Sequence, residues 1–334
     1  MTTPHPTGLV ESRLLGDGHG RFGGRVRETD RVKARHRALT RSYSESLAFR
    51  LRPGNAGSNT AVDHIAVLDE AIAQLPARHR RNLLITCDGA GATLDLIKRI
   101  TTLNAAPGRR VHYSVGFDLD ARARTAIGRL SQTEWDQVLD HRGTPRDPDD
   151  AGVAELTGLL RRSVGGDRLA SWPADLRIIC RRERPSSGAQ LSLMEETDGW
   201  RYQLIATNTP TGTSTGHAQF LEARHRPHAR VEDRIRTGKN TGIGHLPSTS
   251  FALNQAWCVA ATIACDLLCW LRLLCLDGPL ARAEPKTLRY RLLHTAARLV
   301  RGQRKRKIKI PETWPWAREL EACFLAGFAL PPPV

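Results

Sequence analysis

Three short runs in the first third of the chain have the apolar pattern of β-strands. Residues 82–86 are a continuous apolar run, as strands buried on both faces of a parallel sheet are, and residues 111–117 indicate another strand. Residues 46–51 form a weaker candidate, which ends at a turn rich in Gly and Pro over residues 52–57.

Helical spacing separates these runs. Apolar side chains recur every three or four residues from Ile65 to Leu75, and Ser58 or Asn59 can cap the start of this helix. A second helix is predicted over residues 92–102. The order strand, helix, strand, helix, strand predicts an α/β layered core with a parallel portion in its sheet.

Residues 119–211 break this alternation. A charged helix is predicted over residues 121–139, and a polar loop with two prolines follows it. Three later runs are separated by turn residues and predict antiparallel strands: 176–182, 189–195 and 200–207. The chain therefore has a β-rich segment inserted into an α/β pattern.

Helical patterns return after this segment and lead to an apolar stretch over residues 251–276. Its length would suit a membrane span, but Asn254, Gln255, Asp266 and Arg272 would each be costly at a bilayer centre. We therefore expect a buried helix and no membrane association.

The charge composition indicates the kind of partner that the chain binds. The chain has 50 Lys and Arg against 34 Asp and Glu, a net charge of +16 and a pI near 10.3. Such a field favours a polyanion such as nucleic acid, although an arginine-rich proteome gives the same composition. Seven cysteines without a CxxC pair, and no signal-peptide pattern, predict a cytoplasmic protein without a disulfide framework.

Residues 1–41 show neither the apolar periodicity of a helix nor that of a strand. They are rich in Gly and Arg, and we expect a disordered or non-homologous leader. A Gly-x-Gly-x-x-Gly match over residues 18–23 has no strand before it, so we expect no dinucleotide site there.

Two carboxylates are candidates for chemistry, and each has a simpler interpretation. Asp88 directly follows residues 82–87, at a strand end where ligands gather in α/β sheets, but an Asp here equally caps the next helix. Glu232 lies in a basic helical stretch, where an ion pair with Arg236 explains the pattern without catalysis.

Two further groups are candidates for contact with nucleic acid. Residues 301–309 hold six cations and no acid, which fits a DNA-backbone contact and a solvated surface equally. Trp200 and Tyr202 suit either base stacking or the core of a hairpin. We name Arg304, Lys305, Arg306 and Lys307 as DNA contacts.

Four segments occur in one order: LRPGNAGSNTA at 51–61, LLITCDGAGAT at 83–93, RVEDRIRTGKN at 230–240 and RAEPKTLRYRLLH at 282–294. Together they resemble the DDE group 1 transposases of bacterial insertion sequences, over about residues 45–328. The resemblance implies an RNase-H-like fold with a β-rich insertion between the second catalytic Asp and the catalytic Glu.

The resemblance also assigns roles to single residues. It places the second catalytic Asp at Asp88, the catalytic Glu at Glu232 and the Lys of the same helix at Lys239. We name Lys239 and Arg236 as DNA contacts. It implies two Mg²⁺ ions, because this hard ion takes oxygen ligands and two of them clamp the attacking and leaving oxygens of a phosphodiester. Double-stranded DNA would be the substrate, both insertion-sequence ends and target, with a homodimer as the assembly. We therefore expect Asp88 and Glu232 to converge.

Two departures from the family pattern bear on activity. His225 and His228 stand where relatives have Tyr and Arg ahead of the Glu. The first catalytic Asp should lie on a strand before residue 46, yet Asp17 and Asp30 lie in no apolar run. We expect a transposase that is truncated at its N-terminus and impaired. The alternatives are a catalytically inactive DNA-binding remnant and a basic structural protein without a site.

These arguments predict four regions. They are a leader (1–41), an RNase-H-like core (42–118 with 212–280), an insertion (119–211) and a basic C-terminal region (281–334).

Overall fold

The computed structural model describes most of the chain in two compact units. The described residues are 8–10, 24–25, 46–52, 60–140, 142–163, 165–212, 215–302 and 305–330. The first unit ends at Val231 and the second begins at Glu232. This boundary falls inside helix α7 (Ala229–Gly238), and each unit has its own apolar core.

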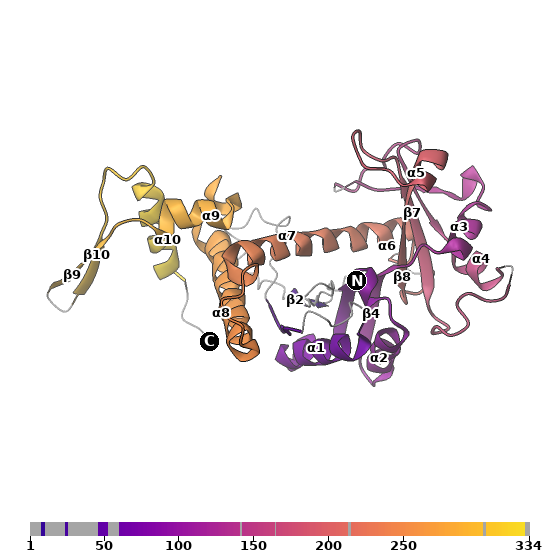
Figure 1. Cartoon of the computed structure of the whole chain (residues 1–334), viewed down its shortest axis with the longest axis horizontal. Helices are drawn as coiled ribbons and strands as arrows, with labels where there is room; N and C mark the ends of the chain where they lie inside the picture. Colours follow the sequence, from indigo (N-terminus) through magenta and orange to yellow (C-terminus); the bar gives the residue numbers. More distant parts are fainter. Residues whose placement is uncertain are drawn as a thin grey trace, which may run out of the picture. The chain divides into compact units, whose positions relative to one another are not determined.

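The first unit is built on one mixed sheet. Its eight described strands lie in the order β2-β1-β3-β4-β8-β7-β6-β5. Their bounds are β1 (Gly8–Val10), β2 (Gly24–Arg25), β3 (Asn82–Cys87), β4 (Arg110–Phe117), β5 (Asp136–Gln137), β6 (Ala151–Glu155), β7 (Arg177–Glu183) and β8 (Arg201–Thr207). Strands β1, β3 and β4 are parallel, and the other neighbouring pairs are antiparallel. This α/β architecture, drawn in Figure 1, is consistent with the predicted RNase-H-like fold.

Helices cover both faces of this sheet. One face packs on α1 (Ala61–Gln74), α2 (Leu94–Ala105), α3 (Ala121–Ile127) and α4 (Thr157–Arg161), and the other packs on α6 (Ala218–His225). Side chains alternate between the two cores, because neighbours along a strand point to opposite faces. Leu204 and Ala206 of β8 join the first core, whereas Ile205 joins the second with Leu221 of α6.

The predicted α/β alternation is confirmed in its centre. Residues 82–86 and 111–117 lie in β3 and β4, which run parallel with Cys87 opposite Val115. The two predicted helices correspond to α1 and α2. Thr60 is the N-cap residue of α1, while Ser58 and Asn59 lie outside the described residues.

The predicted strand over residues 46–51 is wrong. Residues 46–50 have no regular structure and Leu51 forms a single β-bridge. Two ion pairs with Asp63 hold this segment against α1. Arg50 Nη1 lies 3.0 Å from one carboxylate oxygen of Asp63, and Arg52 Nε lies 3.1 Å from the other. The ion pairs therefore replace the strand pairing that the apolar pattern suggested.

The predicted helix over residues 121–139 is too long. Helix α3 ends at Ile127, and Gly128 follows as its C-cap. Ser131 and Glu134 then form a capping box that starts a separate 3₁₀ turn, and β5 follows. The capping residues therefore divide the single helix that the charge pattern predicted into a short helix, a 3₁₀ turn and a strand.

Of the three strands predicted between residues 176 and 207, two are confirmed. Strands β7 and β8 pair antiparallel, with Cys180 opposite Leu204. The third prediction, residues 189–195, is wrong because Ser192 and Glu195 form a capping box that begins α5 (Leu193–Asp198). Strands β5 to β8 extend the sheet beyond β4 and do not form a sheet of their own.

The second unit is helical, with one hairpin. It contains α8 (Phe251–Trp270), α9 (Pro285–Leu288), β9 (Arg298–Gly302), β10 (Lys305–Lys309) and α10 (Ala317–Phe328). Its core includes Leu276, Leu288, Leu292 and Leu320. Arg234 of α7 donates hydrogen bonds to the Cys265 carbonyl and to the Cys269 sulfur of α8, at 2.6 and 2.7 Å, and forms an ion pair with Asp266.

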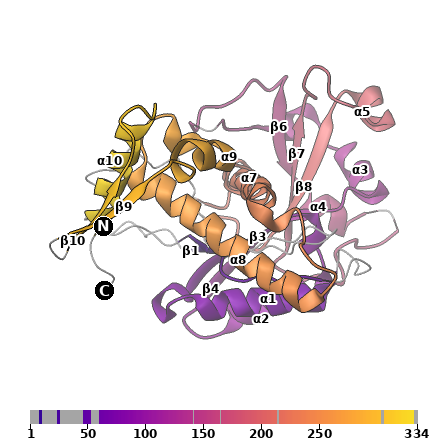
Figure 2. The same cartoon turned by 60° about the vertical axis from the view of Figure 1, so that its left-hand side comes forward.

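Helix α8, orange in Figure 2, is buried along one stripe only. Asn254, Cys258, Ala261 and Cys265 are buried, but several large apolar side chains are exposed: Leu253, Trp257, Val259, Ile263 and Leu267. The expectation of a buried helix is therefore wrong for most of its surface. Among the residues that the structure describes, Phe251–Cys275 is one helix whose length and composition would suit a membrane span.

Candidate active site

Asp88 lies at the carboxyl end of β3, where the parallel part of the sheet stops. Its carboxylate accepts a hydrogen bond of 3.1 Å from the Ala90 backbone N–H and so caps the 3₁₀ turn Gly89–Gly91. The side chain is partly exposed. The capping interpretation is therefore correct in geometry. A carboxylate has several acceptor positions, so a capping bond and a metal ion can share one carboxylate.

Gly116 of β4 allows the backbone that carries Asp88 to approach closely. A Cβ atom added at Gly116 would lie 2.8 Å from the Gly89 nitrogen and 3.2 Å from the Asp88 carbonyl carbon. Real Cβ atoms essentially never approach backbone atoms so closely, and backbone cannot rotate aside as a side chain can. The absence of a side chain at Gly116 thus allows the backbone of Asp88 and Gly89 to lie against β4.

The substitution Gly116→Ala is expected to lower the free energy of unfolding by about 1–3 kcal/mol, the usual range for overpacking. A urea titration of the full chain measures this loss. Gly89→Ala is the matched control, since a Cβ atom there meets nothing within 4 Å. It should change stability by less than about 0.5 kcal/mol. Equal losses in the two variants would contradict the close approach.

His225, at the place where relatives have Tyr, is a buried structural residue. Its Nδ1 shares a hydrogen bond of 2.9 Å with the Ser114 hydroxyl of β4, which joins α6 to the centre of the sheet. Burial lowers the pKa of His225 to about 4, with a smaller contribution from the nearby Arg224 charge. The ring is therefore neutral at pH 7. No cue in the sequence pointed to Ser114, which lies 111 positions away.

The pKa of His225 makes the fold sensitive to acid. The unfolded chain takes up a proton on this ring near pH 6.5, but the native state does so only near pH 4. The stabilisation is therefore complete above pH 6.5 and is lost as the pH falls toward 4. It amounts to about 3 kcal/mol at 1.36 kcal/mol per pKa unit.

Urea titrations of wild type and His225→Gln between pH 4 and pH 7 measure this effect. The variant should lose less stability on acidification than the wild type. The pKa values of His64 and His112 are also lowered by burial, but both residues remain in both proteins, so the difference isolates His225. Identical pH profiles would contradict the neutral, buried ring.

Glu222 of α6 is a second buried residue that sequence reasoning missed. Its side chain is 0% exposed, and its Oε1 lies 2.8 Å from Nε of Arg226 and 3.5 Å from Nε of Arg181 on β7. Burial raises the pKa of Glu222, and the two guanidinium groups act against this shift. The arrangement ties α6 to β7.

The predicted residues of α7 have different surroundings. Val231 and Ile235 are buried. Arg236 is exposed and forms ion pairs with Asp233 and, at 3.1 Å, with Glu284, so its charge is partly neutralised. Lys239 is exposed in a π-helical turn after α7. The Glu232 side chain lies outside the described part, and its convergence with Asp88 stays a prediction.

The other predicted contacts lie in two hairpins. Arg306 and Lys307 are exposed on β10, the backbone of Lys305 begins this strand, and Arg304 lies outside the described residues. Trp200 lies under two guanidinium groups, those of Arg182 and Arg184, at 4.4 and 4.0 Å from its ring centroid. This arrangement favours the hairpin-core interpretation of Trp200 over base stacking.

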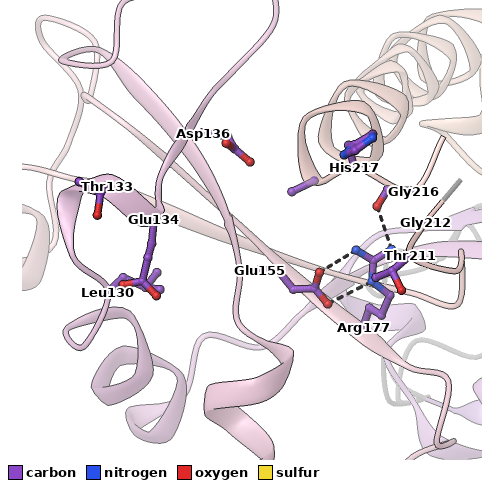
Figure 3. Close-up of a pocket in the computed structure, with 11 residues that line it drawn as sticks. Leu130, Thr133, Glu134, Asp136, Glu155, Arg177, Thr211, Gly212, Gly216 and His217 are labelled. Atoms are coloured by element: carbon purple, nitrogen blue, oxygen red, sulfur yellow. Dashed lines mark hydrogen bonds and ion pairs between the residues drawn. The ribbon is translucent and has the colours of Figure 1, made fainter. Parts of the chain in front are cut away.

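Figure 3 shows a pocket of the first unit with a volume of about 490 Å³. Inside it, Glu155 and Arg177 point toward one another and form a two-point ion pair at 2.7 and 3.0 Å. Arg177 Nη1 also donates to the carbonyls of Thr209 and Gly216. Burial would raise the pKa of Glu155, but Arg177 and a hydrogen bond from Thr157 lower it overall. These bonds hold the loop before α6, which is a structural role.

Mg²⁺ prefers carboxylate oxygens, so Asp88 and Glu232 are donors of the right kind. Within the ranges that the structure describes, His, Cys, Asp and Glu side chains form no cluster of three that suits a metal ion. His217 lines the pocket of Figure 3 and His225 is bonded to Ser114, while the His228 side chain is outside the described part.

The family model described as transposase DDE domain group 1 matches residues 41–328. A comparison with curated proteins gives no significant match. The matched range contains Asp88, Glu232, Lys239 and both strands of the C-terminal hairpin. It covers most of the 334 residues, and the chain therefore belongs to the transposase DDE domain family, group 1.

Proposed function

We propose that this chain acts in DNA transposition, by Mg²⁺-dependent cleavage and strand transfer at the ends of an insertion sequence. The observation that carries the proposal is the position of Asp88. It follows β3 at the carboxyl end of the parallel strands, which is where α/β proteins bind their ligands. The match to the transposase DDE domain over residues 41–328, a range that includes Asp88, supports this proposal.

In this proposal Asp88 and Glu232 supply carboxylate oxygens to Mg²⁺. The bound ion would activate water or a DNA 3′-hydroxyl for attack and stabilise the departing 3′-oxygen. Gly116 keeps Asp88 in place through the close approach of the two backbones. Lys239 is exposed and has no ion pair with the described carboxylates, so its ammonium group can bind a DNA phosphate.

The proposal includes reduced activity, because a third carboxylate is expected beside Asp88. The described strand next to β3 is β1, whose residues Gly8, Leu9 and Val10 have no carboxylate. Asp17 and Asp30 lie outside the described residues. With two ligands of three, two-metal geometry should form poorly. We assign the catalytic core to residues 42–118 and 212–280, with 119–211 as its insertion and a homodimer as the active assembly.

The test is a cleavage assay with the full chain and a DNA duplex that carries the sequences flanking its own gene. With Mg²⁺ or Mn²⁺ we expect binding and only slow nicking, which Asp88→Asn and Glu232→Gln each abolish while binding persists. Asp118→Asn, which changes an exposed Asp just after β4, is the control and should retain the nicking. Cleavage that survives both catalytic substitutions would overturn the assignment.

An inactive DNA-binding remnant is the second candidate, and the carboxylate-free β1 strand favours it. It predicts duplex binding that weakens with salt but no nicking by the wild-type chain under any of these conditions. The same assay therefore separates the two candidates.

A further inference from the structure

The hairpin of β9 and β10 places like charges opposite one another. Its register sets Arg301 against Arg306 and Arg298 against Lys309. Like charges directly across a strand pair are destabilising. A hairpin of two strands is also only marginally stable in water without a further layer. This hairpin therefore carries charges that work against its own formation.

Acidic groups do not offset these charges. Residues 298–309 contain seven Lys and Arg and no Asp or Glu. In the part of the chain that the structure describes, no carboxylate forms an ion pair with the exposed cations of the hairpin: Arg298, Arg301, Arg306, Lys307 and Lys309. In Figure 1 the two strands extend away from helices α9 and α10 of the same unit.

The two faces of the hairpin differ in chemistry. Leu299 and Ile308 are opposite one another, each is 55% exposed, and they share a face with the Arg301–Arg306 pair. The other face carries Arg298, Lys307 and Lys309 with Val300, because successive residues of a strand alternate. One face thus combines two arginines with exposed aliphatic groups, and the other carries Arg298 and two lysines.

We infer that this hairpin is a β-ribbon that binds in the major groove of double-stranded DNA, with the Arg301–Arg306 face toward the bases. The major groove of B-DNA, about 12 Å wide, admits a two-stranded ribbon. Arginine matches the acceptors of guanine, and aliphatic side chains contact the thymine methyl group. Lysines of the opposite face can reach flanking phosphates as point charges. The inference rests on the proposed function for its DNA partner.

The test compares two double variants of the full chain that lose the same charge. Arg301→Gln/Arg306→Gln changes the ribbon, and Lys286→Gln/Arg318→Gln changes exposed cations on α9 and α10 of the same unit. The probe is a labelled 30-base-pair duplex of random sequence. We expect the ribbon variant to bind about tenfold more weakly or worse, and the control to change less than threefold. Equal losses would mean a general charge effect and would overturn the inference.

Two further measurements decide the mode of binding. Methyl green, a major-groove ligand, should compete with the protein, and netropsin, a minor-groove ligand, should not; the reverse result would overturn the inference. An RNA duplex of the same length should bind more weakly, because the major groove of A-form RNA is too deep and narrow to admit side chains. Equal binding to RNA would also contradict it.

Folding and function are controlled separately. Arg301→Lys/Arg306→Lys retains both charges, so it should retain the salt dependence of wild type while losing affinity. The midpoint temperature of thermal unfolding of Arg301→Gln/Arg306→Gln should not be lower than that of wild type, since the substitution removes a like-charge pair. If no duplex binds to wild type, the proposed function fails as well. If wild type binds and the ribbon variants bind equally well, this inference alone fails.

Discussion

Raising the salt concentration from 50 to 200 mM is expected to weaken binding of this chain to duplex DNA by about 1,000-fold. The affinity of a protein that neutralises phosphates falls with salt because bound counterions are released, with a logarithmic slope of about −0.9 per phosphate contact. The hairpin of β9 and β10 with Lys239 supplies enough cations for about six such contacts, and the chain has a net charge of +16. Fluorescence anisotropy with a labelled 30-base-pair duplex, at several salt concentrations, measures the slope.

The slope also tests which cations make the contacts. Lys307→Gln/Lys309→Gln, on the face that meets phosphates in the proposed binding mode, should make it less steep by about two, at 0.9 per contact. Glu222→Gln, a buried change remote in sequence from the basic hairpin, should leave it unchanged. An affinity that falls less than about tenfold over this range would contradict a phosphate-dominated interface.

The parts of the fold that sequence predicted are those with a strong local pattern. Strand β3 is a nearly continuous apolar run, and every residue after Asn82 is buried. Strand β4 alternates instead, and Val111, Tyr113, Val115 and Phe117 pack in one core with helices α1 and α2. Strand β6 (Ala151–Glu155) has a Gly and two Ala and no such pattern. It forms because it pairs with β7 and because its residues Ala151 and Val153 pack in the second core of the sheet. Both are tertiary effects, which the local sequence does not show.

The wrong predictions have local chemical causes. Residues 189–195 have the apolar alternation of a strand, yet the Ser192–Glu195 capping box starts a helix there. Residues 46–51 have a strand-like composition, yet the ion pairs of Arg50 and Arg52 with Asp63 hold them beside α1. In the first segment a capping box between residues three positions apart outweighed the apolar pattern. In the second, ion pairs between residues more than ten positions apart did so.

Some features of the candidate site could be predicted from the local sequence, and others depend on the fold. The place of Asp88 followed from the end of one strand, and its capping role from the preference of Asp for the residue before a helical turn, so both could be predicted locally. The roles of Gly116 and His225 depend on backbone and hydroxyl partners that only the folded chain brings near. The basic hairpin was visible as a charge run, but its cross-strand pairs of like charge required the register.

Glu222 shows how α6, the helix just before the Glu232 segment, is held on the sheet. Its buried carboxylate lies between Arg226, the C-cap residue of this helix, and Arg181 on β7. Arg181 also forms an ion pair with Glu183. If Glu222 were removed, two arginine side chains would remain in contact with a buried space, with one acid fewer to offset them.

Glu222→Ala is therefore expected to lower the free energy of unfolding by about 3–5 kcal/mol, the range for breaking a buried ion pair from one side. Glu222→Gln keeps the volume and the acceptor oxygen but not the charge, and its loss should be smaller. Asp69→Ala is the matched control in the same unit, since it breaks a partly exposed ion pair with Arg99 at 2.9 Å. An exposed pair contributes at most about 1 kcal/mol. Urea titrations of the three variants at pH 7 give the comparison. Losses for Glu222→Ala no larger than those for Asp69→Ala would show that Glu222 does not stabilise the packing of α6 on β7.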